Sequence, residues 1–200
     1  MRLQESTLEK LLADIGRTSP RISGSTAALV AAQLGAAMAK MGLLVSENHG
    51  FDNEEAVEQL DSIVTDIKAA TERDRAASTA LIDAYRRSSD ESNLQRARAE
   101  ATREPLAAGN LLIELLALLE KNSARVDPSV ASDFHGGVEM IGASFKAVMM
   151  SVETNLKDDL TTDLRNRTSS DWANLLARYE TAREALRRSA NAHADALTCC

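Results

Sequence analysis

The residues between positions 19 and 25 form the segment of this chain that is best suited to hold a ligand. They read Ser-Pro-Arg-Ile-Ser-Gly-Ser and run into a long helical pattern that begins near Ser23. The first turn of a helix leaves backbone N–H groups without intrahelical partners, at the positive end of the helix dipole. Such a helix start can bind an anion or the polar edge of a ring. Gly24 and Ser25 are therefore candidate ligand-binding residues.

Arg21 is the one charged residue of this loop. A guanidinium group recognises carboxylates through two parallel hydrogen bonds, which makes Arg21 a candidate contact for an acidic ligand or ligand tail. Most arginines are exposed surface cations, and for Arg21 that alternative stays open.

The helix that follows the loop is built so that a partner can approach its backbone closely. Small residues recur at every fourth position in two adjacent strips: Gly24, Ala28, Ala32 and Ala36, and Ala27, Ala31, Gly35 and Ala39. Residues four apart share one helix face. A bulkier strip elsewhere on the helix consists of Val30, Leu34, Met38, Met41 and Val45. The small strips predict close packing against another helix or a flat ligand, and they favour a tight, isologous homodimer.

The remaining pattern is helical throughout and predicts an all-α, single-domain bundle of about six helices over residues 1–200, which is dimeric. Capping signals predict that a first helix begins at residues 6–9 and ends near Gly16. Further helices are expected at residues 23–47, from 52–55 to about 88, and at 91–121, where Pro105 should produce a kink. A fifth helix is expected from 127–129 to Asn155. Residues 158–168 are expected as a loop unless Leu160 and Leu164 continue the helix, and residues 169–171 as the cap of the last helix.

Composition excludes several classes of function. The 200 residues are 44% hydrophobic and carry a net charge of −7, which argues against a nucleic-acid partner because phosphates need a basic surface. The apolar stretch at 27–45 is interrupted by Gln33 and Lys40, and the first five residues hold no apolar signal core, so we expect no membrane partner and a cytoplasmic location.

Histidine and cysteine usage gives no sign of a metal site or a disulfide. The three histidines, His49, His135 and His193, lie far apart in the sequence without ligand spacing, so no metal is expected. The two cysteines, Cys199 and Cys200, are adjacent and terminal, and are expected to be reduced thiols without a role.

The order of several short motifs resembles the family of formiminotetrahydrofolate cyclodeaminases and methenyltetrahydrofolate cyclohydrolases. The motifs are Ser19-Pro20, Gly24-Ser25, the run 34–41, Asp74 with Ala76-Ala77, Ala101 to Pro105-Leu106, Ser132-Asp133 and Asn155-Leu156-Lys157. The resemblance implies an all-helical, dimeric, folate-processing protein that holds no permanently bound cofactor and uses a tetrahydrofolate derivative as substrate. The chain departs from the family pattern at Arg21-Ile22-Ser23, where glycines are usual, at Leu44, where asparagine is common, and at Ser78, where an aromatic residue is common.

The resemblance implies which residues do the chemistry. Asp74 and Asp133 match acidic positions of the family, and either could stabilise the cationic carbon of a methenyl bridge and accept the proton of an attacking water. Asn155 could orient the pterin or the water. Two other interpretations remain open: Asp74 as one charge on a solvated face among residues 72–75, and Asp133 as a helix N-cap.

Asp133 and Asn155 cannot line one small pocket if they lie on one straight helix. They are 22 positions apart, which corresponds to roughly 33 Å at the rise of an α-helix. Either the helix bends, or a two-fold dimer brings opposite ends together.

Three functions are therefore compatible with the sequence. The first is a cytosolic homodimeric enzyme that acts on methenyl- or formimino-tetrahydrofolate. The second is a divergent relative that carries out another cyclisation, deamination or elimination on a non-folate small molecule. The third is a non-catalytic helical dimer that serves as a binding module.

Overall fold

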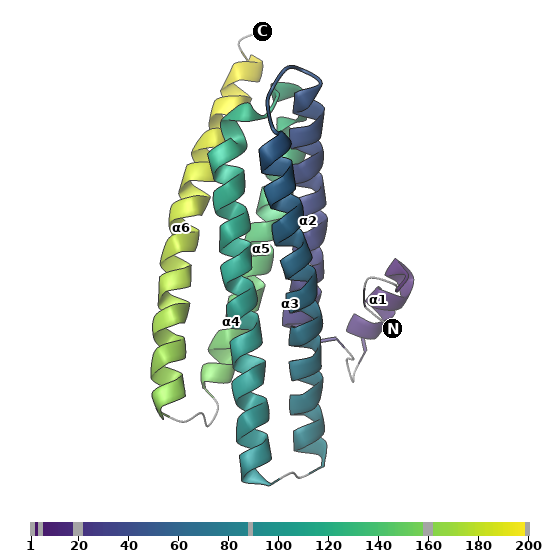
Figure 1. The fold of residues 1–200 in the computed structure, drawn as a ribbon, viewed down its shortest axis with the longest axis vertical. Helices are drawn as coiled ribbons and strands as arrows, with labels where there is room; N and C mark the ends of the chain where they lie inside the picture. Colours follow the sequence, from purple (N-terminus) through teal and green to yellow (C-terminus); the bar gives the residue numbers. More distant parts are fainter. Residues whose placement is uncertain (1–2, 4–5, 18–21, 88–89, 158–161, 199–200) are drawn as a thin grey trace.

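The computed structural model describes residue 3 and residues 6–17, 22–87, 90–157 and 162–198. These residues contain six α-helices and no β-strand, which confirms the all-α prediction. The helices are α1 (Leu8–Ile15), α2 (Gly24–Glu47), α3 (Glu54–Arg86), α4 (Glu91–Asn122), α5 (Ala131–Leu156) and α6 (Thr162–Thr198). Short 3₁₀ turns at Ser123–Arg125 (η2) and Pro128–Val130 (η3) connect α4 to α5. The five long helices lie side by side along one axis, and α1 lies beside them (Figure 1).

Side-chain caps fix several of these helix starts. The hydroxyl of Thr7 accepts a hydrogen bond from the Lys10 N–H, Ser23 accepts from the Thr26 N–H, and Asp90 accepts from the Asn93 N–H. Each of these side chains satisfies one backbone donor that the first helical turn leaves unpaired. Local sequence therefore predicts the starts of α1, α2 and α4 correctly.

The prediction for the last helix is wrong. α6 begins at Thr162, so residues 169–171 lie inside it rather than at its cap, and the predicted loop can include only residues 158–161, which lie outside the described residues. Tertiary packing favours the longer helix. Four buried side chains follow helical spacing along α6 and face the bundle: Thr168, Leu175, Tyr179 and Leu186.

The start of α5 also differs from the expectation. Asp127 caps the η3 turn by accepting a hydrogen bond from the Ser129 N–H, and α5 begins only after it, with Val130 at its N-cap. Asp133 lies in the first turn of α5. Its interpretation as an N-cap is therefore wrong, because the backbone enters the helix before this residue.

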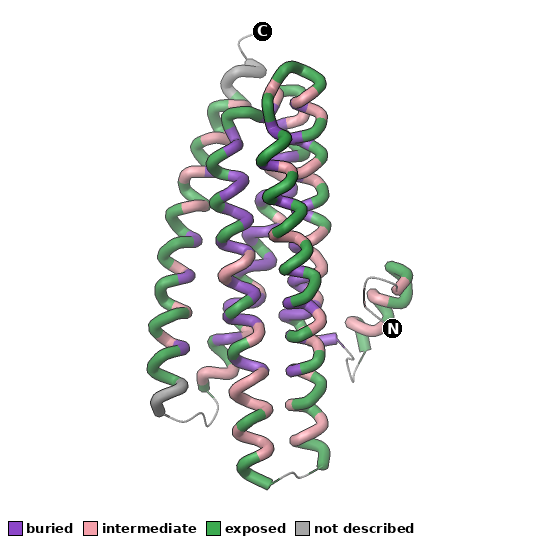
Figure 2. Tube along the Cα trace, in the orientation of Figure 1, coloured by how far each residue is buried: buried purple, intermediate pink, exposed green. Residues whose placement is uncertain are grey.

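The small-residue strips of α2 pack against α5 of the same chain. Gly35 faces Gly137 so closely that an added Cβ on Gly35 would lie 2.6 Å from the Gly137 carbonyl oxygen. Farther along, a Cβ on Gly42 would lie 2.9 Å from the Cβ of Phe134, so the two helices run in opposite directions. Buried residues line this contact and the centre of the bundle (Figure 2).

The bulky strip of α2 is the face that stays uncovered in one chain. Leu34 is 55% exposed and Met41 is 42% exposed, and Val30, Met38 and Val45 are half-buried. Around Gly35 and Ala39 the small-residue strips are thus used within the chain, against α5. The homodimer stays a prediction, and α2 would contribute its bulky strip to it.

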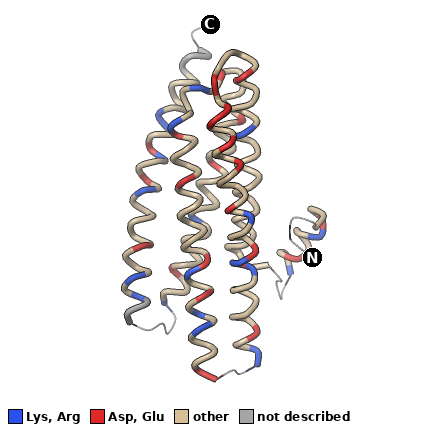
Figure 3. The backbone as a smooth tube through the Cα atoms, in the orientation of Figure 1, with Lys and Arg blue, Asp and Glu red and all other residues tan. Residues whose placement is uncertain are grey.

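The charged residues lie mainly along α3, α4 and α6, whereas α2 carries only Lys40 and Glu47 (Figure 3). In the part of the chain that the structure describes, α2 is also the one helix that is long and apolar enough to cross a membrane by length and composition. In the fold it is a core helix, with 44% of its most apolar window buried. Its buried side chains pack mainly against α5 and α3, whereas Leu34 and Met41 of the bulky strip stay exposed in one chain.

We expect Gly137→Ala to lower the free energy of unfolding by about 1–3 kcal/mol, because the new Cβ would lie 2.8 Å from the Ala39 backbone nitrogen. The matched control is Gly136→Ala. Its Cβ would meet only the flexible end of Met38 at 3.4 Å, so it should be neutral or stabilising by about 0.4–1 kcal/mol. Urea unfolding of both variants measures the difference, and equal stabilities would contradict the close-packing argument.

Candidate functional site

Asp74 is buried beneath the start of α2, where three hydroxyl groups surround its carboxylate. The Ser25 hydroxyl lies 3.0 and 2.9 Å from its two oxygens, and the Ser23 hydroxyl lies 3.2 Å from Oδ2. The Thr26 hydroxyl donates a hydrogen bond to the same Oδ2. Asp74 is 1% exposed. Its interpretation as one charge on a solvated face is therefore wrong.

The register of α3 explains this burial. Asp74 continues a buried series at helical spacing on the inner side of α3, which consists of Ile67, Ala70, Thr71, Asp74 and Ala77. Its charged neighbours Arg73 and Arg75 point away from the core and pair with Glu104 and Glu72. One helix face thus carries the carboxyl inward while the adjacent faces remain charged and solvated.

Burial raises the pKa of Asp74 above its usual value, because a charged carboxylate loses its water. Hydrogen bonds from Thr26, Ser25 and Ser23 act in the opposite direction, and the negative charge of Glu104 adds a further increase. The balance leaves a carboxyl group that holds its proton more tightly than an exposed aspartate does.

A groove of about 350 Å³ opens at the Ser23 and Ser25 hydroxyls. Its walls come from the start of α2, the second half of α3, Ala101 of α4 and the end of α5. The lining residues are Ser23, Ser25, Ser78, Leu81, Ile82, Ala101, Met150, Ser151, Thr154 and Asn155. Ser23 and Ser25 both line the groove and donate to Asp74, so one hydroxyl group separates the buried carboxyl from the groove.

The end of α5 contributes Asn155 to the same groove. Its side-chain Nδ2 donates a hydrogen bond to the backbone carbonyl of Ala101 over 2.8 Å. The antiparallel packing of α2 and α5 places the end of α5 beside the start of α2. Ser25 and Asn155, which are 130 positions apart in the sequence, therefore line one groove.

The other predicted site residues are distributed differently. Gly24 is the exposed first residue of α2, next to the groove-lining serines, and an added Cβ there would meet nothing within 4 Å. Arg21 lies outside the described residues. Asp133 is exposed in the first turn of α5, beside Phe134 and the Gly42 end of α2. Asp133 and Asn155 thus lie at opposite ends of α5, and Asp133 does not line the groove of its own chain.

Sequence reasoning misses Ser23 and Thr26 as site residues. It places Ser23 at the start of a helix and in the segment that departs from the family pattern, without a role in the site, yet this serine caps α2 and donates to Asp74. A serine at the start of a helix is a local signal for capping. The partner of these hydroxyls on α3, about 50 positions away, has no such local signal.

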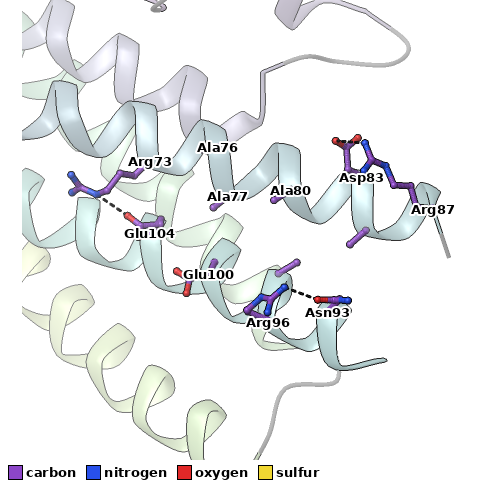
Figure 4. Close-up of a pocket in the computed structure, with 12 residues that line it drawn as sticks. Arg73, Ala76, Ala77, Ala80, Asp83, Arg87, Asn93, Arg96, Glu100 and Glu104 are labelled. Atoms are coloured by element: carbon purple, nitrogen blue, oxygen red, sulfur yellow. Dashed lines mark hydrogen bonds and ion pairs between the residues drawn. The ribbon is translucent and has the colours of Figure 1, made fainter. Parts of the chain in front are cut away.

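A second groove, of about 640 Å³, runs between α3 and α4 (Figure 4). Its floor is lined by alanines, among them Ala76, Ala77 and Ala80. Charged side chains at its rim pair with neighbouring rim residues: Arg73 with Glu104 at 3.0 Å, and Arg87 with Asp83 at 3.8 Å. The smaller groove is the better candidate site. Of the two grooves, it is the one whose lining includes hydroxyl groups bound to the buried Asp74 carboxyl, which has a raised pKa.

The fold also brings two histidines together. His135 Nε2 and His193 Nδ1 lie 3.0 Å apart, between the start of α5 and the end of α6. Burial, and then the charge of His193, lower the pKa of His135. The described residues contain no group of three or more His, Cys, Asp or Glu side chains that could hold a metal ion.

Comparison with known proteins agrees with this architecture. The sequence profile of the family described as formiminotransferase-cyclodeaminase matches residues 7–174, and the chain belongs to that family. The crystal structure of formiminotetrahydrofolate cyclodeaminase from Thermotoga maritima superimposes with a TM-score of 0.86 at 20% sequence identity, covering 95% of this chain and 98% of that one. At this identity the likeness shows the fold. A search of curated proteins gives no match.

Replacing Asp74 with asparagine should change how stability depends on pH. Since the folded protein holds the Asp74 proton more tightly than the unfolded chain does, the parent loses stability as pH rises from about 3.8 through the raised pKa. The variant has no carboxyl at this position and does not lose this stability. The difference in free energy of unfolding, variant minus parent, should therefore increase between about pH 3.8 and the raised pKa and be constant above it. Denaturant unfolding between about pH 4 and 8 measures it. Asp66→Asn, at an exposed position of the same helix, is the control. Parallel pH profiles for Asp74→Asn and the parent would show that the Asp74 pKa is not raised.

Proposed function

We propose that this protein is an enzyme that acts on methenyl- or formimino-tetrahydrofolate, with the Asp74 carboxyl as its acid and base. The observation that carries the proposal is the buried Asp74 carboxyl, which reaches the groove through the Ser25 hydroxyl at 2.9 Å. Membership of the formiminotransferase-cyclodeaminase family supports the choice of substrate.

A carboxyl in this position suits both reactions. In the hydrolysis of a methenyl bridge, water adds to the cationic carbon between two nitrogens and must lose a proton. Asp74 would receive that proton through Ser25. In the cyclodeamination of a formimino group, a second amine N–H of the same folate attacks the formimino carbon and ammonia leaves. The same carboxyl would take the proton from the attacking nitrogen and return it to the departing one. A raised pKa brings its proton affinity closer to neutral pH, which favours transfer in both directions.

The composition of the groove suits a flat nitrogen heterocycle. Its described lining holds hydroxyl and amide groups and the apolar side chains of Leu81, Ile82 and Met150, and no charged side chain. Apolar side chains can contact the faces of a ring, while the serines and Asn155 can bind its polar edges. Arg21 remains our proposed contact for the acidic tail of a folate, and Gly24 remains a proposed substrate contact at the start of α2.

Asp133 remains an alternative to Asp74 as the catalytic carboxylate. Because it lies far from the groove of its own chain, it would act in the groove of a second copy. A two-fold dimer would be needed to bring the Asp133 end of one copy to the groove of the other. We also propose that the enzyme works as a cytoplasmic homodimer without a permanently bound cofactor. Sedimentation at micromolar concentration tests the dimer, and a monomer would exclude a shared site.

Asp74→Asn should lower the turnover of methenyltetrahydrofolate by roughly 10²–10⁴-fold, because it removes the group that accepts the proton. The loss of absorbance of this substrate measures the rate. Asp66→Asn, on the exposed side of α3, should leave the rate unchanged.

The same assay on Asp133→Asn separates the two carboxylates. A loss of turnover confined to Asp133→Asn would assign the proton transfer to Asp133 and overturn the proposal for Asp74. Full activity of Asp133→Asn, with loss in Asp74→Asn, is the result that we expect.

A divergent activity on a non-folate small molecule is the second candidate, and one observation favours it. In the loop where the family usually has glycines, Ile22 is buried and Ser23 is bound to Asp74, so side chains occupy space that glycines would leave open. Calorimetric titration with methenyltetrahydrofolate distinguishes the two functions. Absence of both binding and turnover would leave the divergent enzyme, or a non-catalytic binding dimer, as the function.

A further inference from the structure

The backbone carbonyl of Ala101 is left without its helical donor. In an α-helix each N–H donates to the carbonyl four residues earlier, and the donor for Ala101 would come from residue 105. Residue 105 is a proline inside α4, which has no N–H, and its ring also pushes against that carbonyl. Pro105 does not end α4, which continues to Asn122. The proline therefore leaves one free acceptor at a defined place on the inner side of the helix.

The side chain of Asn155 occupies the place of the missing donor. Its Nδ2 lies 2.8 Å from the Ala101 oxygen, although the two residues come from different helices and are 54 positions apart. A carbonyl oxygen can only accept, so the nitrogen end of the amide must face α4. Within the described part of the chain the oxygen end, Oδ1, makes no hydrogen bond to protein and is not among the buried unsatisfied atoms. Both Asn155 and Ala101 line the groove.

We propose that Pro105 is a positioning residue for the groove: by freeing the Ala101 carbonyl, it holds the Asn155 amide with Oδ1 available to accept an N–H of the ligand. The ligand class is a nitrogen heterocycle that presents a ring or exocyclic N–H at this point. This inference deepens the proposed function and rests on it for the effect on turnover, whereas the link between Pro105 and Asn155 stands by itself. An amide that is already oriented before the ligand arrives needs no reorganisation on binding.

Pro105→Ala restores the backbone donor and so tests the link directly. The variant should fold and should be at least as stable as the parent, because proline is the least favourable residue in a helix interior. The new backbone N–H at position 105 should bind the Ala101 carbonyl and displace the Asn155 amide. Pro128→Ala is the matched control. Pro128 is the first residue of η3, just before α5, where a proline removes no helical hydrogen bond.

Amide hydrogen exchange by NMR reads out the link without any ligand. In the parent and in Pro128→Ala, the Asn155 Nδ2 protons should exchange slowly with water. In Pro105→Ala they should exchange at least about tenfold faster, because a hydrogen bond worth about 1.4 kcal/mol corresponds to that factor. The backbone N–H that the substitution creates at position 105 should be protected. Unchanged exchange of the Asn155 amide in Pro105→Ala would overturn the proposal.

Kinetics on the folate substrate then test the positioning role. Pro105→Ala and Asn155→Ala should each lower kcat/KM about tenfold, and the double variant should be no worse than Asn155→Ala alone, because both act through one side chain. If the Asn155 amide of Pro105→Ala exchanges faster but kcat/KM equals that of the parent, the positioning role is overturned. If the parent shows no turnover, the proposed function fails, and the exchange experiment alone decides whether Pro105 holds Asn155.

Discussion

The backbone contact between α2 and α5 determines where every other part of the candidate site lies. Gly35 and Gly137 have no side chains, so the carbonyl of each helix comes within van der Waals range of the other helix's backbone. Larger residues at these positions would force the helices apart. Because the helices are antiparallel and in close contact, the start of α2 lies beside the end of α5, and the groove forms where these two ends meet α3 and α4.

A buried carboxylate is unfavourable unless polar groups replace its lost water. In this fold the first turn of α2 supplies them. Ser23, Ser25 and Thr26 all place hydroxyl groups on Asp74, and Ser23 also caps the helix. The loop that departs from the usual glycines of the family thus contributes part of the carboxylate's surroundings. Its change in sequence bears on the chemistry of the site as well as on its shape.

Two interruptions of regular helix structure converge on the same groove. The start of α2 carries the hydroxyl groups of Ser23 and Ser25, and Pro105 leaves the Ala101 carbonyl of α4 without its helical donor. In the interior of a regular helix every backbone N–H and C=O group is hydrogen-bonded within the helix. Such interruptions are therefore the places where a helical bundle can present polar backbone atoms to a ligand. In this protein one of the free groups is taken by a side chain, Asn155, which itself lines the groove.

Local rules suffice to predict the helical class, most of the helix boundaries and the separation of Asp133 from Asn155 within one chain. A capping hydroxyl at Ser23 satisfies a donor three residues away, and the rise per residue sets the length of α5. The start of α6 could not be predicted in this way, because Thr168, a polar residue of the predicted loop, is buried in register with Leu175 and Tyr179.

Which of the candidate residues act together depends on tertiary packing alone. Helical spacing places Asp74 on the same face of α3 as Ile67 and Ala70, but nothing local shows that hydroxyl groups of α2 will surround its carboxyl. The pairing of Asn155 with the carbonyl freed by Pro105, and that of His135 with His193, join residues more than 50 positions apart. Such pairs depend on how two helices are packed, and the packing is set by the summed burial of many side chains, which no short motif encodes.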